Sequence, residues 1–472
     1  MRIEHDFLGQ MELEDQAYYG IQTVRGVQNS NVTGHTYGED GMKVVRAMAR
    51  IKKAAALANE QIGALDEKRA WAIGVAADEV LAGKLDDQFP VDMVTGGGGV
   101  SIHMNLNEVL AHRASMLLDG MEVHPNTHVN MGQSTNDVLP SAMLLTTHSL
   151  ILEVVKAVDV LAEAVAERAE AFKDVVKLGR TCLQDAMPVT VGQELTGWHS
   201  FLLRHRQLLL YRADECLELP LGGTAVGTGV GAMPGYVEAV YPHLKTLTGY
   251  NVKPAANFFD AMQFADEYVH VSATLKSLAA GVSKMASDLR ILSSGPRGGF
   301  GELRLPAVLP GSSIMPGKMN PILPELMIEI YLLVHGNDAS VTMAAERGEL
   351  DLNVWEAVIT KCILESCRLL TRGLPRFARD CIAGLEVNEA HCHRQASTSA
   401  AIAMVISAVF GYETGSAVAR KALEENKTVA EVAVEQGLMD EETAKNLLDP
   451  SLMTHGDSMA DAIAKLRKAV KQ

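Results

Sequence analysis

The sequence predicts a mostly α-helical protein with a central bundle of long helices. Hydrophobic residues make up 47% of the 472-residue chain, whereas aromatic residues make up only 5%. Ala, Leu, Val and Met therefore supply most of the apolar surface, and this composition favours helices packed on helices. Long stretches that are poor in Pro and repeat apolar residues every three or four positions give the same prediction.

The elements follow in order along the chain. Residues 1–140 mix short helices with Gly-rich turns, and residues 141–176 contain neither Gly nor Pro and predict one helix of roughly 50 Å. Further long helical stretches are expected at about 190–218, 258–292 and 322–372, and shorter helices from about 396. This pattern predicts three domains: 1–140, a central long-helix bundle at 141–395, and a small helical domain at 396–472. Several apolar stripes are too wide for one chain to cover, so burial in an oligomer is expected.

Charge and cysteine usage exclude several classes of function. The net charge of −16 argues against nucleic acid or an anionic membrane as a partner. The N-terminus carries Glu4 and Asp6 and lacks the apolar core of a signal peptide, and no run of eighteen apolar residues predicts a membrane span. The six cysteines lack metal-ligand spacing, so reduced thiols and a cytoplasmic location are expected.

Four polar stretches interrupt the helical pattern. They are GGGGVSIHMNLNE (96–108), NMGQSTNDVLP (130–140), GRTCLQDAMP (179–188) and GSSIMPGKMNP (311–321). Each brings hydroxyl, amide or backbone donors close to an expected helix start, where free N–H groups favour anions. Helix capping is the alternative explanation for Ser134, Thr135, Asn136 or Thr181 taken singly.

Together these stretches resemble the aspartase/fumarase superfamily. GSSIMPGKMNP matches the signature GSSxMPxKxNP, and the similarity continues through AYYGIQTVR, QSTND, GRTCLQDAMP, GGTAVGTG and SSGPR. QSTND and VTMAAE are more similar to aspartate ammonia-lyases than to fumarases. The resemblance implies a mostly α, three-part fold and a homotetramer whose active sites are each built from three subunits. It also implies that the enzyme acts on a small amino-acid-like molecule. Because the sequence shows neither metal-ligand spacing nor a phosphate-binding glycine loop, no metal or cofactor is expected.

The family eliminates an amine or hydroxide from the carbon next to the one that loses a proton, and leaves an alkenoate. By the resemblance, Ser312 is the base, Ser313 a further donor, and Lys318 and Asn320 hold the α-carboxylate. Serine is a weak base, so positive charge or N–H groups must activate Ser312. Positional matching also assigns Ser134, Thr135 and Asn136 to the second carboxylate and the amine, Thr181 to the amine, and Glu325 to support of the site.

Three positions depart from the family pattern. The family reads GxGTxxNMN where this chain reads GGGVSIHMN, so Val100 replaces a threonine donor and His103 replaces an asparagine. Cys182 stands where fumarases carry histidine. Loss of the threonine donor would cost an aspartate-derived intermediate about 3 kcal/mol. The departures therefore predict a substrate whose second group is not a carboxylate, and they disfavour hydration.

One branch of the superfamily fits these departures. Ergothionase expels trimethylamine from ergothioneine, a betaine of 2-thiohistidine, and Val100, His103 and Cys182 suit an imidazole-thione and a quaternary amine. Trp355 is expected to help bind the trimethylammonium group, with packing as its alternative role. Three other functions stay open: a true aspartate ammonia-lyase, a fumarate hydratase, and a non-catalytic structural protein of the crystallin kind.

Overall fold

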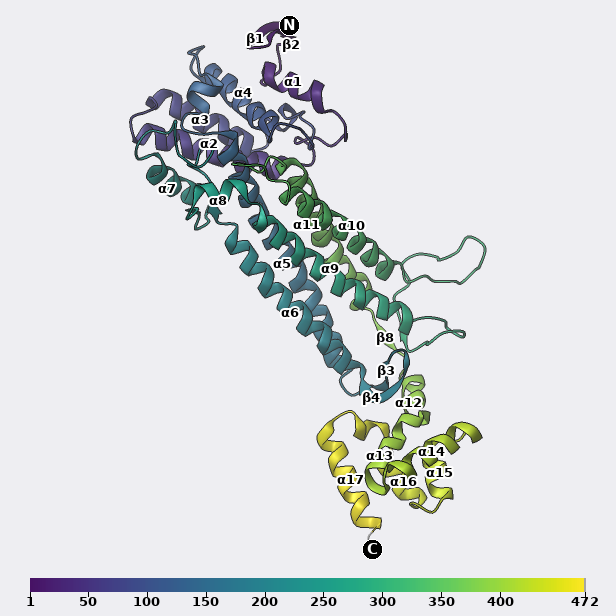
Figure 1. The fold of residues 1–472 in the computed structure, drawn as a ribbon. Helices are drawn as coiled ribbons and strands as arrows, with labels where there is room; N and C mark the ends of the chain where they lie inside the picture. Colours follow the sequence, from purple (N-terminus) through teal and green to yellow (C-terminus); the bar gives the residue numbers. More distant parts are fainter. Residues whose placement is uncertain (471–472) are drawn as a thin grey trace. The chain divides into compact units, whose positions relative to one another are not determined.

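The computed structural model describes residues 1–470 and is built almost entirely of helices (Figure 1). Contacts divide the chain into two units. Unit 1 comprises residues 1–156, 205–279 and 330–371, and unit 2 comprises 157–204, 280–329 and 372–472. The predicted boundaries at 140 and 395 remain a prediction.

The first part of unit 1 holds a short hairpin and several helices. They are β1 (Arg2–Asp6), β2 (Gly9–Leu13), α1 (Ile21–Ser30), α2 (Met42–Gln61), α3 (Glu67–Leu81), η1 (Asp86–Gln88), α4 (Val100–Leu117) and the π-helical turn η2 (Pro125–Val129). Later residues add β5 (Glu218–Leu219), α7 (Tyr236–Thr248), β6 (Lys253–Pro254) and α8 (Phe258–Gln263). Helix α2 packs against α3 and α7, because its many alanines allow close approach and are almost completely buried.

Five long helices form the predicted bundle: α5 (Thr135–Ala171), α6 (Val191–Glu215), α9 (Asp266–Leu292), α10 (Ile322–Ala345) and α11 (Glu356–Phe377). Within unit 1, side-chain contacts join them: α5 to α6 through His148 and the Ala213 carbonyl at 2.7 Å, and α9 to α10 through Lys276 and Asp338 at 2.5 Å. The prediction of a long-helix bundle is therefore confirmed.

The helix boundaries differ from the expected ones in three places. Helix α5 begins at Thr135 rather than Ser141, with Pro140 inside it. The expected helix over 258–292 is broken between α8 and α9, where Phe264 is extended with ψ 146°. The stretch 322–372 is broken between α10 and α11, because the Asn353 side chain donates to the Ala344 and Ala345 carbonyls at 3.3 and 3.1 Å and so caps α10.

Unit 2 contains two antiparallel strand pairs, β3–β4 and β7–β8, and the C-terminal helices. Its short elements are β3 (Val176–Thr181), β4 (Gln184–Thr190), β7 (Leu303–Arg304), η3 (Ala378–Ile382) and β8 (Glu386–Val387). The helices that follow are α12 (Glu389–Thr398), η4 (Ala400–Ile402), α13 (Ala403–Phe410), α14 (Tyr412–Glu425), α15 (Val429–Glu435), α16 (Glu441–Leu447), η5 (Pro450–Met453) and α17 (Gly456–Val470). These C-terminal helices enclose a core that includes Ile406, Val418 and Val432, as the shorter helical pattern predicted.

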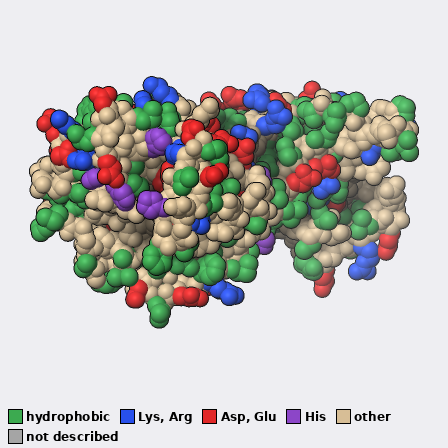
Figure 2. Space-filling view, turned by 90° about the horizontal axis from the view of Figure 1, so that it is seen from above, with side chains coloured by type: hydrophobic (Ala, Val, Ile, Leu, Met, Phe, Trp, Pro, Cys, Tyr) green, Lys and Arg blue, Asp and Glu red, His purple; other side chains and the backbone are tan. Residues whose placement is uncertain are grey.

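The surface carries charges of both signs. On the face shown in Figure 2, acidic and basic side chains are interspersed, with hydrophobic side chains scattered between them. All six cysteines are free thiols. Within residues 1–470, no helix is both long and apolar enough to cross a membrane.

Candidate active site

The signature loop surrounds the Ser312 hydroxyl with backbone donors. Its Oγ accepts hydrogen bonds from the N–H groups of Ile314 at 3.2 Å and Met315 at 3.0 Å. Two N–H donors on one hydroxyl oxygen favour its deprotonated form, because they stabilise negative charge there. The loop amides that the sequence suggested as activating groups are therefore present around Ser312.

A short internal frame closes this loop. The Gly311 N–H donates to the Lys318 carbonyl at 2.8 Å, and the Asn320 amide donates to the Gly311 carbonyl at 2.9 Å. A Cβ at position 311 would lie 2.7 Å from the Asn320 nitrogen, so only glycine fits there. The frame exposes the side chains of Ser313 and Lys318. Both can therefore meet an anion from solvent.

Glu325 lies in the first turn of α10, directly after the loop. Its carboxylate lies 3.5 Å from the Arg290 guanidinium, and the two side chains are 41% and 45% exposed. A carboxylate at this position also favours the helix N-terminus electrostatically. Glu325 therefore stabilises the start of α10, directly after the signature loop.

Thr181 and Cys182 lie at the tip of the β3–β4 hairpin. Thr181 pairs with Gln184, which leaves Cys182 and Leu183 as a two-residue turn with φ of 53° and 60°. Positive φ at both central residues suits the hairpin twist but normally selects Asn or Gly. Side chains with a Cβ are strained there, and such strain is typical of functional positions. The Cys182 thiol is exposed.

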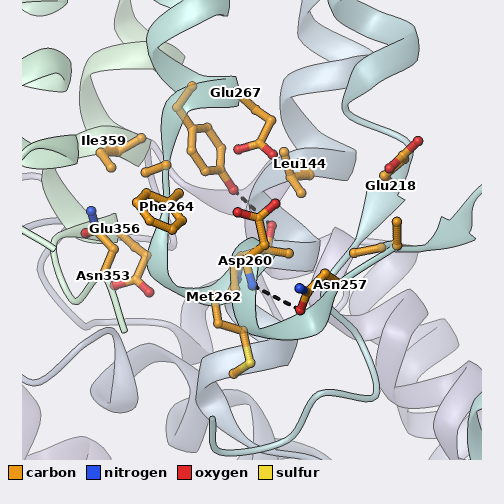
Figure 3. A pocket seen from close by; sticks show the side chains of 16 residues that line it. Leu144, Glu218, Asn257, Asp260, Met262, Phe264, Glu267, Asn353, Glu356 and Ile359 are labelled. Atoms are coloured by element: carbon orange, nitrogen blue, oxygen red, sulfur yellow. Dashed lines mark hydrogen bonds between the residues drawn. The ribbon is translucent and has the colours of Figure 1, made fainter. Parts of the chain in front are cut away.

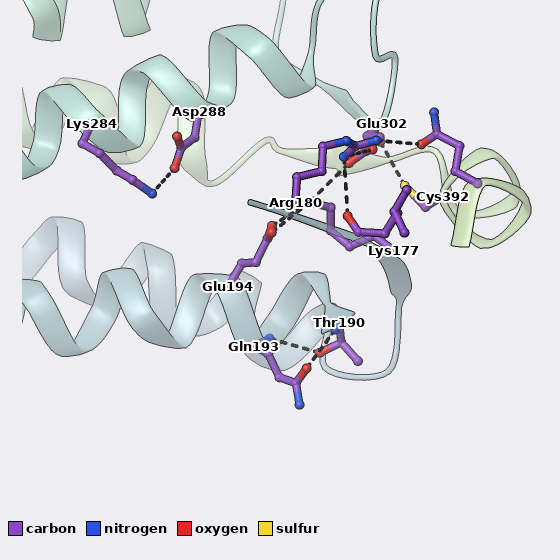
Figure 4. A network of polar contacts seen from close by, with 11 residues as sticks. Lys177, Arg180, Thr190, Gln193, Glu194, Lys284, Asp288, Glu302 and Cys392 are labelled. Atoms are coloured by element: carbon purple, nitrogen blue, oxygen red, sulfur yellow. Dashed lines mark hydrogen bonds and ion pairs between the residues drawn. The ribbon is translucent and has the colours of Figure 1, made fainter. Parts of the chain in front are cut away.

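A buried ion-pair network fixes this hairpin (Figure 4). Glu302, with a completely buried side chain, lies 2.6 Å from Arg180 Nη1 and 3.3 Å from Lys177 Nζ. Lys177 also contacts Glu194 of α6 at 2.9 Å. Removing one partner from such a network leaves a buried charge without compensation. Strand β3, which leads to Thr181, is thereby anchored through Lys177 and Arg180.

In unit 1, the QSTND stretch forms the N-terminus of α5. Asp137 is completely buried and accepts hydrogen bonds from the N–H groups of Ser134 at 2.9 Å, Gly222 at 3.0 Å and Thr224 at 3.1 Å. Burial raises its pKa to about 6 despite these donors. Asp137 therefore ties the Gly-rich loop after β5 to the helix start.

Asn136 adds a second tie to the same loop, because its amide nitrogen donates to the Ala225 carbonyl at 2.8 Å. The Ser134 hydroxyl accepts from the Asn136 N–H at 3.3 Å, which is the capping geometry considered for it from sequence. Pro140 has no N–H, so it gives no helical hydrogen bond to the Asn136 carbonyl.

Thr135 contacts the buried base His103, which in turn contacts the buried base Lys52. His103 Nδ1 lies 2.7 Å from Thr135 Oγ1, and His103 Nε2 lies 2.7 Å from Lys52 Nζ. Lys52 also donates to Asn130 Oδ1 at 2.8 Å. Burial lowers the pKa of Lys52 and of His103 well below their ordinary values. A neutral imidazole that accepts from Lys52 at Nε2 donates its Nδ1–H to Thr135, which leaves the threonine hydroxyl proton for another acceptor.

Val100 is the first residue of α4 and is 43% exposed. It follows Gly99, which has φ of 72° and where a Cβ would lie only 2.0 Å from Leu139 Cδ2, so the turn needs glycine. Val100 lines an open hollow of about 360 Å³ with Ser101 and Arg25. Val100 therefore places an apolar side chain at a helix start, where a hydrogen-bond donor would help to bind an anion.

Trp355 precedes α11, and its indole N–H donates to the Arg347 carbonyl at 2.8 Å. The ring is 41% exposed, so part of it is open to a ligand. Of the acidic residues near Trp355 in the sequence, Glu349 and Asp351 are exposed and Glu356 is buried.

The predicted residues belong to both units. Val100, His103, Ser134, Thr135, Asn136 and Trp355 are in unit 1, and Thr181, Cys182, Ser312, Ser313, Lys318, Asn320 and Glu325 are in unit 2. Within unit 1, His103 contacts Thr135, and the Ser134 hydroxyl accepts from the Asn136 N–H. Within unit 2, Asn320 contacts Gly311 across the signature loop. Sequence reasoning missed Lys52 and Asp137. Lys52 had a signal, because it shares the apolar stripe of α2 with Met48, Ala55 and Ala56.

Comparison with known proteins defines the class. The Lyase family matches residues 9–336, and the Fumarase C C-terminus family matches 402–455. The chain therefore belongs to the aspartase/fumarase superfamily and is an enzyme of the lyase kind.

Individual relatives match nearly the whole chain. An aspartate ammonia-lyase of Helicobacter pylori is 40% identical over 458 residues, with 96% of this chain and 98% of the relative covered. A class II fumarate hydratase of Halobacterium salinarum is 43% identical over 460 residues, with 96% and 97% covered. Since relatives with both names match at similar identity, identity alone does not select the leaving group.

Solved structures agree on the fold. A cobalt-bound fumarate lyase:delta crystallin of Brucella melitensis superposes with a TM-score of 0.93 at 41% identity, covering 96% of this chain and 99% of that one. A class II fumarase of Schistosoma mansoni gives 0.92 at 34% identity, covering 96% and 99%. The predicted aspartase/fumarase-type fold is therefore confirmed.

Proposed function

We propose that the protein is a carbon–nitrogen lyase that eliminates an amine from a 2-amino or 2-trimethylammonio carboxylate and leaves an alkenoate. The observation that carries this proposal is the Ser312 hydroxyl, which accepts two loop N–H groups at 3.2 and 3.0 Å. A serine oxygen in this setting is suited to hold negative charge and to take up a proton. The family relationship and its aspartate ammonia-lyase members support the same reaction.

In the proposed reaction, Ser312 removes the proton from the carbon next to the electron-withdrawing group. Lys318 and Asn320 hold the α-carboxylate, and Ser313 donates a further hydrogen bond. The pair of electrons left on carbon forms the double bond as the amine departs from the adjacent carbon. Because the intermediate carries extra charge, fixed donors aimed at it supply most of the rate enhancement.

The other predicted residues are assigned to the rest of the substrate. Ser134, Thr135, Asn136 and Thr181 bind the second group and the amine. His103 is 1% exposed and contacts Thr135, so we assign its influence to the orientation of the Thr135 hydroxyl. Glu325 supports the helix behind the loop.

The preferred substrate has a second group that is not a carboxylate. Val100 offers no hydrogen bond at the α4 start, and an anion against it loses water without a replacement donor. An imidazole-thione, as in ergothioneine, tolerates an apolar wall, and its trimethylammonium group has no N–H that needs an acceptor. The exposed part of the Trp355 ring is assigned to that cation. Trimethylamine release, as by an ergothionase, is therefore the specific proposal.

Relatives of known name favour two alternative reactions, deamination of L-aspartate and hydration. The aspartate ammonia-lyase relatives favour deamination of L-aspartate, and the 43% identical fumarate hydratase favours hydration. Cys182 argues against hydration, because a thiol is less suited than histidine to exchange protons with water near neutral pH, and fumarases carry histidine at this position.

We also propose that the enzyme is a cytoplasmic homotetramer with each active site shared between three subunits. Long helices of the single chain expose large apolar side chains, and this favours burial against other copies. They include Leu203, Leu208 and Tyr211 of α6 and Leu332, Leu333 and Met343 of α10. Sedimentation or light scattering of the purified protein measures this assembly directly.

The deciding experiment offers the purified protein L-aspartate, L-malate and ergothioneine in separate ultraviolet assays. Thiolurocanate and trimethylamine from ergothioneine, with no fumarate from aspartate, are expected. Fumarate from aspartate would instead assign an aspartate ammonia-lyase, and fumarate from malate a hydratase. Ser312→Ala is the control: its activity should fall by at least about 100-fold. Activity that survives this change would overturn the role of Ser312.

A further inference from the structure

A separate pocket lies within unit 1, between the start of α9 and the start of α11 (Figure 3). Its volume is about 120 Å³, and neither Trp355 nor residues 134–136 line it. The apolar part of its wall includes Leu144, Met262, Phe264 and Ile359, and the acidic part consists of Glu218, Asp260, Glu267 and Glu356. No Lys or Arg is among the lining residues. Glu218 is paired with Lys253, which lies outside the wall, at 2.5 Å, so Asp260, Glu267 and Glu356 are the carboxyl groups without a basic partner in the wall.

Glu356 is the decisive residue. Its side chain lines the pocket although the residue is only 5% exposed, and its Oε2 atom is buried without a hydrogen-bond partner. Burial raises the pKa of this carboxyl to about 7. A buried carboxylate without a partner is unfavourable, and a cation in the pocket would remove that penalty.

The neighbouring carboxyls add to the same field. Burial, and after it the nearby Asp266 and Asp260, raise the pKa of Glu267 to about 7. In the view of Figure 3, Asp260 lies between Glu356 on one side and Glu218 on the other. Asp260 and Glu267 of unit 1 therefore add negative charge to the wall that holds Glu356.

Size and geometry select the kind of cation. Within residues 1–470, no three His, Cys, Asp or Glu side chains lie close enough together to hold a metal ion. A cavity of about 150 Å³ holds benzene, so this pocket has room for about four or five heavy atoms. Phe264 and Tyr268 supply aromatic surface, which suits alkylated ammonium groups.

We propose that this pocket binds a small alkylammonium ion, with the Glu356 carboxylate as its counter-ion. The binding of such a cation does not depend on the elimination reaction, whereas a product-sensing role for the site rests on the proposed function. Its ligand belongs to the same chemical class as the amine that a carbon–nitrogen lyase releases, so the site would give the enzyme a means of sensing its product.

Tetramethylammonium is the test ligand, because it keeps its charge at every pH. Isothermal titration calorimetry at pH 8.5 measures its binding to the full-length protein, with sodium chloride at equal ionic strength as the reference. Binding is expected for the wild type, and Glu356→Gln should weaken it at least about tenfold, which corresponds to one lost charge pair. Glu346→Gln, which removes an exposed carboxylate outside the pocket, should leave it unchanged.

The pH dependence gives a second readout. Binding should weaken as the pH falls from 8 to 6, because Glu356 and Glu267 take up protons in this range. Asp260 and Glu218 also line the pocket, but Glu218 is paired with Lys253 at 2.5 Å. Tyr268, whose pKa burial raises well above 10, stays neutral. If Glu356→Gln does not fold, Ala261→Leu fills the pocket and should abolish binding. Equal binding by the wild type and either pocket variant, or no binding beyond the sodium reference, would overturn the proposal.

Discussion

Lys52 Nζ lies 2.7 Å from His103 Nε2, and both side chains are buried in unit 1. Two bases at this distance cannot both be positively charged without strong repulsion in a medium of low polarity. The contact is therefore made by a neutral imidazole with a lysine whose pKa burial lowers well below its usual value. Its effect reaches the N-terminus of α5 through the hydrogen bond between His103 and Thr135.

This pair predicts how stability depends on pH. Lys52 binds a proton in the unfolded chain up to about pH 10 but releases it far more readily when buried, so its contribution to stability grows as the pH rises. The raised carboxyls Glu267 and Glu356 have a pKa of about 7 and still lose protons between pH 7 and 8, which lowers stability as the pH rises. This contribution is common to the wild type and a Lys52 variant, so the difference between the two reports on Lys52 alone. Between pH 7 and 8, Lys52 should therefore contribute a slope of up to about 1.4 kcal/mol per pH unit to the free energy of unfolding.

Urea unfolding of the wild type and of Lys52→Met at pH 7.0, 7.5 and 8.0 measures this slope. The wild type should gain stability relative to the variant as the pH rises. Lys53→Met is the matched control, because Lys53 is partly exposed and contacts Asp78 at 2.7 Å. Parallel curves for the wild type and Lys52→Met would mean that Lys52 is protonated in the folded protein.

The hydrogen bond from His103 to Thr135 predicts that the two residues act as one unit. Once an active substrate is identified, His103→Ala and Thr135→Val should each lower kcat/KM, and the double variant should lose little more than the worse single one. A coupling free energy of about 1 kcal/mol or more is expected for a direct buried hydrogen bond. Strict additivity would contradict the assignment, and Thr135→Ser, which keeps the hydroxyl, should keep most of the activity.

The fold followed from the sequence where one physical signal dominated. Apolar residues at helical spacing over dozens of positions leave few alternatives to a helical bundle, so the long helices were predicted. The breaks were missed where their cause is tertiary: the cap on α10 comes from the Asn353 amide, and the bend at Phe264 contains neither Gly nor Pro. The start of α5 was predicted at Ser141, six residues too late, because Pro140 was taken as the helix boundary.

The candidate site followed only in part. Hydroxyl and amide residues near helix starts were visible from motifs, but the partners that orient them were not. Lys52 and Lys53 are adjacent in sequence, and only the packing of α2 shows that the first is buried and the second reaches solvent. Asp137 looked like one more polar residue of QSTND, whereas its three N–H partners include two from a loop about 85 residues later.

The turn at the hairpin tip predicts a trade between stability and activity. Cys182 has φ of 53°, so Cys182→Gly should relieve strain and raise the free energy of unfolding by about 1 kcal/mol. Leu183→Gly, at φ of 60°, should give a similar gain and serves as the control without a thiol change. Thermal unfolding measures both variants. If the thiol contacts substrate, only Cys182→Gly should lose activity, and equal losses would assign the effect to backbone flexibility.

Val100 gives the most direct test of substrate choice. Val100→Thr adds one hydroxyl at nearly constant volume at the start of α4, where the side chain is 43% exposed. A donor there should stabilise the intermediate from a dicarboxylate by about 3 kcal/mol, or roughly 100-fold in rate, if the geometry is favourable. Activity toward L-aspartate should therefore rise in Val100→Thr and fall for a substrate with an apolar second group. Val100→Ala separates the hydroxyl from simple loss of bulk, because it removes apolar surface without adding a donor. If the Ala variant gains aspartate activity as much as the Thr variant does, the size of residue 100 controls the substrate, and the missing donor does not.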